Sequence, residues 1–212
     1  MNSEIAGIKV PDSQIAKEAA ELLRDYGTEL LWNHSNRVFF FSSVMGKESG
    51  QTYDPELLYV SALFHDLGLT NEYSSENYRF EVDSANAAKK FLLQHQIPDE
   101  SARLVWDAIA LHTTIGIAEH REPQVSLLYS GVGLDVMGDG FDQFPASARE
   151  AIIKAYPRGD FKNNIIPAFY DGFKHKQDTT FGNINADVCA FMNRDYKRKN
   201  FCDCILHSPW KS

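Results

Sequence analysis

His65 and Asp66 stand side by side in Leu63-Phe64-His65-Asp66-Leu67-Gly68, at the end of the apolar run 57–64. An imidazole and a carboxylate on a core-facing helix are costly to bury unless they are paired or bind a cation. One divalent metal would satisfy both groups, which makes a metal site the economical explanation. The dipeptide alone is a weak signal, because His-Asp also occurs by chance, so other parts of the chain must supply further ligands.

Two more residues complete a candidate ligand set. His34 lies upstream, on the apolar stripe of a segment with helical periodicity, and Asp135 lies downstream on the apolar face of another such segment. A lone histidine in this position is more often a hydrogen-bonded core residue, and an unpaired buried aspartate is expensive. Taken together with the His-Asp pair, however, they predict one shared site. We predict that His34, His65, Asp66 and Asp135 are the metal ligands.

This order of residues, His then His-Asp then Asp, resembles the HD superfamily of metal-dependent hydrolases. The matches are more specifically similar to the cyanamide hydratase branch, and they run from about residue 10 to residue 135. The resemblance implies an all-α helical bundle that holds a divalent cation in its interior. It also implies that Asp66 both binds the metal and handles protons. The residues that carry the closer similarity are 33–39, 58–60, 63–66 and 134–135.

Three further polar residues are predicted near the metal. His112 ends the apolar face of a predicted helix; we predict a catalytic role, while proton donation and binding of substrate or of a second metal stay open. Phe80-Glu81 resembles a pair that lies near the site in cyanamide hydratases, although a first-turn acid can also face solvent and complement the helix dipole. Thr70 opens the polar loop 70–77, which suits substrate contacts or a lid but also a plain linker. We predict Thr70 and Glu81 as substrate contacts.

The number and type of metal ions follow from the same residues. Apart from His95, which we interpret as a surface residue at a helix end, His112 and His120 are the only histidines between Asp66 and Asp135, and their separation does not match the extra histidines of binuclear HD proteins. A mononuclear site is therefore predicted. Imidazole and carboxylate ligands suit Zn²⁺, Fe²⁺, Mn²⁺, Co²⁺ and Ni²⁺, of which we predict Zn²⁺.

Helix signals cover most of the chain. Asp54-Pro55-Glu56 combines an N-cap with a proline in the first turn, which starts the helix that carries the His-Asp pair in its last turn. Gly68 is expected to end that helix, and the residues before Val10 are expected to form a loose arm. We predict an all-α fold, a single HD-domain helical bundle over 1–212 with its core at about 13–137 and C-terminal helices at 145–200 packed on it. The expected helices are 13–25, 29–47, 55–66, 79–96, 98–113, 123–137, 145–156, 161–176 and 181–196.

Composition limits the partners. The chain has 212 residues, 43% of them hydrophobic, and a net charge of −8, which argues against a nucleic-acid backbone as partner. We expect no membrane association, because no apolar run approaches the roughly 20 residues of a membrane span. No signal peptide is recognised. A small-molecule substrate is expected, and a homo-oligomer stays open.

The cysteines fit the same picture. The chain has 3 cysteines, a low and odd number that favours the reducing cytoplasm over secretion. Cys202, Cys204 and His207 offer only three of the four protein ligands that structural zinc normally takes. We therefore interpret this segment as a tail with free thiols.

The predicted set of ligands leaves open positions at the metal, where a coordinated water can lose a proton near neutral pH. The first electrophile that fits is a small nitrile such as cyanamide, whose hydration gives urea. The second is the phosphorus of a nucleotide, but a phosphate needs cationic donors and the motifs show no dense basic cluster. We predict a cyanamide hydratase-like enzyme, with an HD-type nucleotide phosphohydrolase and a non-catalytic metal-binding sensor as the alternatives.

Overall fold

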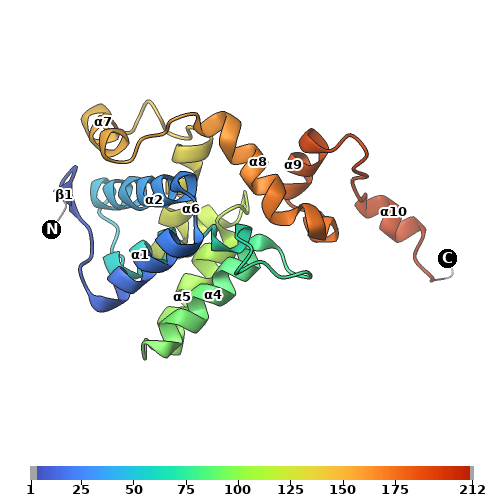
Figure 1. Ribbon diagram of the computed structural model, residues 1–212, viewed down its shortest axis with the longest axis horizontal. Helices are drawn as coiled ribbons and strands as arrows, with labels where there is room; N and C mark the ends of the chain where they lie inside the picture. Colours follow the sequence, from blue (N-terminus) through green and yellow to red (C-terminus); the bar gives the residue numbers. More distant parts are fainter. Residues whose placement is uncertain (1–3, 211–212) are drawn as a thin grey trace.

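The computed structural model describes residues 4–210, and these form a helical protein (Figure 1). Five helices build the central bundle, in which α2 packs on α3 and α6, and α5 packs on α3, α4 and α6. The all-α prediction is confirmed. The helices of the bundle are α2 (Glu29–Glu48), α3 (Pro55–Phe64), α4 (Phe80–Gln94), α5 (Asp99–Leu111) and α6 (Pro123–Val136).

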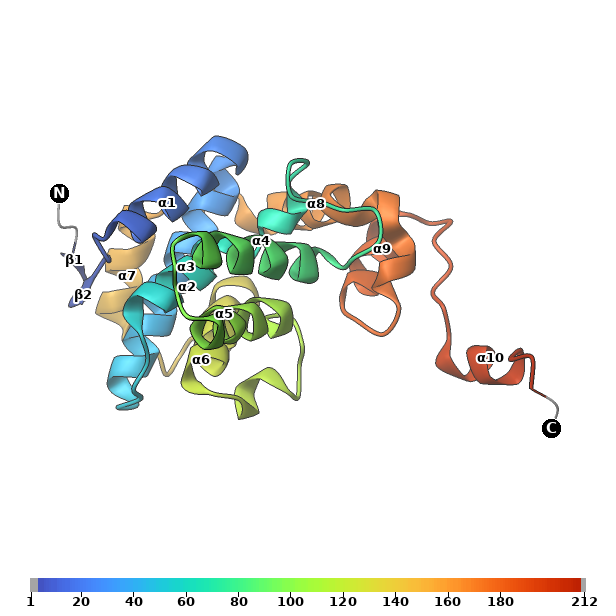
Figure 2. The same ribbon diagram turned by 90° about the horizontal axis from the view of Figure 1, so that it is seen from below.

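The remaining elements surround this bundle or extend from it. α1 packs on α3 and α7 packs on α2, while α8, α9 and α10 lead away to one side in both views, with α10 farthest out (Figure 2). Among residues 4–210, no helix is both long enough and apolar enough to cross a membrane. The bounds are α1 (Gln14–Tyr26), α7 (Ala146–Ala155), α8 (Phe161–Phe173), α9 (Asn185–Met192) and α10 (Phe201–Leu206).

Side-chain caps fix where the ligand-bearing helices begin. Thr28 accepts a hydrogen bond from the Leu31 amide at the start of α2, and Asp54 accepts from the amides of Glu56 and Leu57 at the start of α3. Each cap satisfies amide groups that have no partner within the helix. The predicted starts of both helices are therefore confirmed.

The end of α3 differs from the prediction. The helix stops at Phe64 and a short 3₁₀ helix, η1 (Leu67–Leu69), follows, so that Gly68 lies inside this element and does not end α3. Gly68 is needed for close approach, because a Cβ there would lie 2.2 Å from the carbonyl oxygen of Phe80. Its amide also donates to the Ser84 hydroxyl. The prediction for Gly68 was wrong because packing of η1 against α4 places the glycine.

Other differences lie at the two ends of the chain. The expected loose arm contains a two-stranded antiparallel hairpin, β1 (Glu4–Ile5) and β2 (Ile8–Lys9), and its residues 1–3 lie outside the described part. The helix expected over 181–196 is shorter, and α10 was not expected at all. A kinked 3₁₀ segment, η3 (Lys174–Thr180), connects α8 with α9.

Most apolar side chains form one core, but a second and smaller cluster lies under the C-terminal helices. It consists of Phe80, Phe173 and Cys189, with Phe169 and Tyr170 among the half-buried residues around it. We call these residues the C-terminal cluster. Its only fully buried contribution from the bundle is Phe80, at the start of α4.

The contact between α2 and α6 depends on a glycine. A Cβ at Gly131 would lie 2.1 Å from the Ser42 hydroxyl and 2.7 Å from the carbonyl oxygen of Val38. We expect Gly131→Ala to lower the free energy of unfolding by about 1–3 kcal/mol, because overpacking forces the helices apart. Urea unfolding measures the change.

Gly133→Ala is the matched control, because Gly133 lies on the same helix. Its Cβ would meet only the far end of the Asp139 side chain, at 2.9 Å, which can rotate away. A loss of stability that is as large for Gly133→Ala as for Gly131→Ala would contradict the packing argument.

Candidate metal centre

The predicted ligands and His112 converge from four helices of the bundle. His34 lies in α2, the His65-Asp66 pair directly follows α3, His112 directly follows α5, and Asp135 lies in the last turn of α6. All five are buried, with exposed fractions between 0% and 2%. Packing of α2 and α5 on α3, and of α2 on α6, brings together residues that are far apart in sequence.

Three of these residues form a compact group that could hold a metal ion. One ligand atom each from His34, His65 and Asp66 lies within 4.8 Å of the others. The Nε2 atoms of the two histidines are 3.1 Å apart. Asp66 Oδ2 lies 3.5 Å from His34 Nε2 and 3.3 Å from His65 Nε2.

The hydrogen bonds of the two Nδ1 atoms determine whether each Nε2 atom carries a proton or a lone pair. His65 Nδ1 donates to the carbonyl oxygen of Ala62 at 2.7 Å, and His34 Nδ1 donates to Asp135 Oδ2 at 2.6 Å. In a neutral imidazole the second nitrogen then carries a lone pair. Two lone pairs that face each other at 3.1 Å repel unless a proton or a metal ion lies between them.

The buried Asp66 carboxylate also favours a bound cation. Both of its carboxylate oxygens are buried, and neither has a hydrogen-bond partner among residues 4–210. Burial acts to lower the pKa of His65, yet the Asp66 carboxylate outweighs it and raises that pKa. The centre thus favours a positive charge, which a divalent metal would supply, and the imidazole and carboxylate groups fit such a cation.

His112 lies on the other side of the Asp66 carboxylate. Its Nδ1 donates to the carbonyl oxygen of Ile109 at 2.6 Å, so its Nε2 is the nitrogen that faces Asp66 Oδ1, at 3.6 Å. The imidazole ring packs edge-on against His65, with ring centres 4.9 Å apart. His112 is therefore next to the group of three but outside it, in a position that suits proton transfer.

Asp135 contacts the Nδ1 side of the His34 ring, opposite the Nε2 atom that faces His65 and Asp66. Its two oxygens accept hydrogen bonds from Arg37 Nε and Nη2, both at 2.8 Å, from His34 Nδ1 and from Arg158 Nη1. These four donors occupy the lone-pair positions of a carboxylate. A carboxylate behind a ligand histidine fixes its tautomer and orientation, and the ligand role predicted for Asp135 stays a prediction.

The two arginines that bind Asp135 come from different parts of the chain. Arg37 lies one turn from His34 in α2, and the structure buries it completely against Asp135. Arg158 was missed. It lies in the Pro157-Arg158-Gly159-Asp160 turn, where no periodicity predicts the direction of a side chain.

Glu81 is buried, and its carboxylate is held by three side chains. Arg79 Nη2 donates to it at 2.7 Å, the Thr113 hydroxyl at 2.6 Å and the Asn185 amide at 3.3 Å. Burial acts to raise the pKa of Glu81, but the hydrogen bond and charge of Arg79 lower it on balance. Glu81 does not face solvent as a first-turn acid would, and contact with a substrate stays a prediction.

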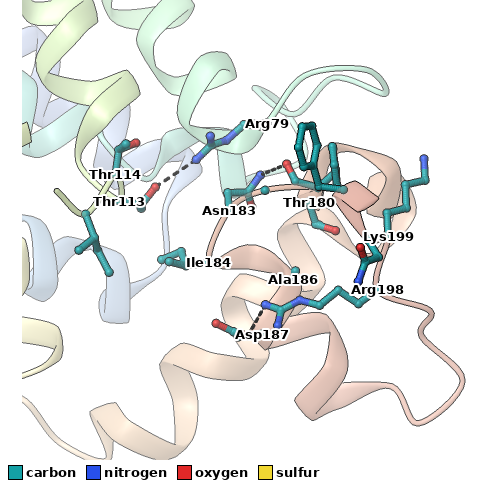
Figure 3. Close-up of a pocket in the computed structure, with 15 residues that line it drawn as sticks. Arg79, Thr113, Thr114, Thr180, Asn183, Ile184, Ala186, Asp187, Arg198 and Lys199 are labelled. Atoms are coloured by element: carbon teal, nitrogen blue, oxygen red, sulfur yellow. Dashed lines mark hydrogen bonds and ion pairs between the residues drawn. The ribbon is translucent and has the colours of Figure 1, made fainter. Parts of the chain in front are cut away.

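The same arginine and threonine line a cavity of about 520 Å³ between the bundle and the C-terminal segment (Figure 3). Arg79 and residues 113–115 form one wall, and residues 180–184, 186–187 and 198–201 form the other. Arg198 and Lys199 in that wall pair with Asp187 and Asp178. Thr70 does not line this cavity; its hydroxyl donates to the carbonyl oxygen of Leu67.

Comparison with known proteins agrees with this geometry. The family model described as HD domain matches residues 31–154, more than half of the chain. This range contains all four predicted ligands and His112, while Arg158 lies beyond it. A search of curated proteins found no match. The chain therefore belongs to the HD domain family, whose members are in general metal-dependent hydrolases.

Proposed function

We propose that this protein is a metal-dependent hydratase or hydrolase of a small neutral molecule, with cyanamide or another small nitrile as the first candidate. His34, His65 and Asp66 would hold the cation, and Zn²⁺ is the metal proposed. The chemistry that such a cation supplies is Lewis-acid activation of water near neutral pH.

The observation that carries this proposal is that the arginines around the centre are already engaged. Arg37 and Arg158 both bind Asp135, and Arg79 binds Glu81. A phosphoryl group has spare anionic oxygens that need donors of this kind. A nitrile has none, so its uncharged atoms suit a closed interior in which the cationic side chains are already paired.

Asp66 and His112 would orient the water molecule and transfer its protons. Asp66 has both oxygens without hydrogen-bond donors, so one oxygen can orient a water molecule while the other faces His112. His112 Nδ1 is fixed on Ile109, which leaves Nε2 as the nitrogen that exchanges a proton with Asp66 Oδ1. Hydration of a nitrile forms a bond from the water oxygen to the nitrile carbon while a C–N π bond breaks and one water proton moves to nitrogen. Transfer of the second proton from that oxygen to nitrogen, as the C=O bond forms and the second π bond breaks, gives the amide, which for cyanamide is urea. No leaving group is required.

One observation favours a second candidate, an HD-type phosphohydrolase that acts on nucleotides. Arg79, Arg198 and Lys199 all line the cavity next to Thr113, and an anionic ligand could compete for their present carboxylate partners. This cavity is also much larger than cyanamide requires. The candidate depends on whether these ion pairs open, which a substrate assay decides.

The test compares two products with the same purified, metal-loaded protein. We expect urea to be released from cyanamide, and little phosphate to be released from a panel of nucleotide monophosphates and diesters. His65→Ala serves as the control for metal-dependent turnover. Phosphate release without urea would favour the second candidate, and a metal-loaded protein that is inert on both would favour a non-catalytic sensor. Elemental analysis of the same sample identifies the metal.

A further inference from the structure

The metal centre is closed to solvent in this structure. His34 and His65 are fully buried, and Asp66 and His112 are only 1% and 2% exposed. Two cavities, of about 520 and 690 Å³, lie where the C-terminal segment meets α4. Neither of them is lined by these four residues. A third cavity, of about 200 Å³, is lined by Asp135 and Arg158 but by none of these four residues. A substrate can therefore reach His65, Asp66 and His112 only if part of the protein moves.

Aromatic side chains of α8 and α4 cover the centre. The ring of Phe161 lies 5.3 Å from the His34 ring. Phe80 packs 5.6 Å from His112 and is in turn covered by Phe173, whose ring stacks on it at 6.0 Å. Phe80 thus covers His112, and Phe173 at the C-terminal end of α8 covers Phe80.

The two ends of α8 belong to different apolar clusters. Phe161 and Ile165, near its start, are buried in the main core, whereas Phe173 at its end belongs to the C-terminal cluster. Pro167 lies between them, inside the helix. A proline in this position lacks the amide that the helix ladder needs and weakens the helix at that point. Bending of α8 is therefore easiest at Pro167, between its two halves, with Phe169 as the residue that contacts both clusters.

One buried ion pair holds this moving half against the bundle. Lys176 in η3 donates to Asp83 Oδ2 at 2.6 Å and to the Ser74 hydroxyl at 2.8 Å, and its side chain is fully buried. The same Asp83 oxygen accepts from the Ser75 amide. The contact thereby joins η3, α4 and the polar loop 70–77 that follows the His-Asp pair.

The energetics of this pair suit a contact that opens. Two buried charges attract each other strongly, but most of that gain repays the cost of removing them from water. When the pair separates into solvent, both ions recover their hydration. The Lys176–Asp83 pair therefore specifies the closed position more than it stabilises it. The hydrogen bond from Asn185 to Glu81 is another polar contact between the C-terminal segment and α4.

We propose that residues 168–192 form a cover over the His112 side of the metal centre, hinged at Pro167, and that Lys176 and Asp83 are its latch. The structure describes the closed state, and opening separates Phe173 from Phe80. The inference concerns access to the centre, so it holds for a nitrile and for a nucleotide alike.

Amide hydrogen exchange on the full-length, metal-loaded protein tests the cover directly. In the wild type we expect η3 and α9 to exchange through a local opening, at least about tenfold faster than α2 and α3, because this segment packs in its own small cluster. Lys176→Met keeps the length and apolar stem of the side chain but removes its charge. It should speed exchange in η3, α9 and the loop 70–77, and leave α2 and α3 unchanged.

Lys174→Met is the matched control, because Lys174 makes the same kind of ion pair, with Asp171, at a half-exposed position. It should leave exchange unchanged. A second readout is the rate at which a chelator removes the metal, which should rise in Lys176→Met alone. The proposal fails if η3 and α9 of the wild type exchange only as slowly as α2, and this result requires no variant to fold. It also fails if Lys176→Met leaves the loop and η3 unchanged or speeds α2 equally.

Discussion

Replacing His65 by alanine is expected to abolish metal binding and, with it, turnover. His65 supplies one of only three grouped ligand atoms, and its Nε2 faces that of His34 at 3.1 Å. Loss of a residue that merely supports a ligand costs roughly 10–100-fold in metal affinity, so loss of a ligand should exceed this range. Elemental analysis after gel filtration measures metal content, and turnover is measured with whichever substrate the cyanamide and nucleotide assays identify.

His120→Ala is the control for this experiment. His120 lies in the segment between α5 and α6 and is exposed, so metal content and turnover should stay at the wild-type level. Retention of stoichiometric metal by His65→Ala would show that the group of three is not the binding site. Asp66→Ala should behave as His65→Ala does.

Asp135→Ala is expected to lower the free energy of unfolding by about 3–5 kcal/mol, as is typical when one partner of a buried ion pair is removed. The substitution leaves the guanidinium of Arg37 at 0% exposure without a counter-charge. Urea unfolding measures the loss. Asp139→Ala is the control, because Asp139 is exposed and lies only one turn further along the chain. A loss below about 1 kcal/mol, the range of exposed pairs, would contradict the network.

The stability that Asp135 provides should also depend on pH. Burial acts to raise the pKa of Asp135, but the hydrogen bonds and charges of His34 and Arg37 outweigh it and lower that pKa. A carboxylate with a lowered pKa contributes fully above the pKa of the unfolded chain, about 4, and its contribution is lost as the pH falls further. The difference between wild type and Asp135→Ala should therefore shrink in acid.

Metal affinity of a milder variant, Asp135→Asn, decides the role of this residue. A direct ligand should give a loss as large as that of His65→Ala. A carboxylate that only orients His34 should give the roughly 10–100-fold loss of a supporting residue. The contacts of Asp135 with four donors favour the second result.

The sequence predicted the elements that are determined locally. Caps and prolines at Thr28 and Asp54 act within a few residues, and so the starts of α2 and α3 were correct. The His-Asp pair was recognisable because burying both groups in an apolar run requires compensation. His34 followed from its place on an apolar helix face, which packing then turned toward the interior.

What could not be predicted depends on contacts between distant parts of the chain. Gly68 looked like a helix end, and only the approach of Phe80 explains it. Arg158 lies in a turn without periodicity, and its partner is 23 residues away. The direction of the Asp135 carboxylate depends on these arginines, because side-chain spacing gives the helix face but not which atoms meet there.

Three side chains of the C-terminal segment bind carboxylates of the bundle, and these contacts indicate how much of the chain the folded unit requires. Arg158, Lys176 and Asn185 all follow the last residue matched by the family model, and each binds a carboxylate within the matched range, on Asp135, Asp83 and Glu81. A fragment cut at residue 154 would keep every candidate ligand yet leave three interior acids short of donors. Shortened or fused versions should therefore retain the chain through Lys199, because Tyr196, Arg198 and Lys199 still bind Thr180, Asp187 and Asp178.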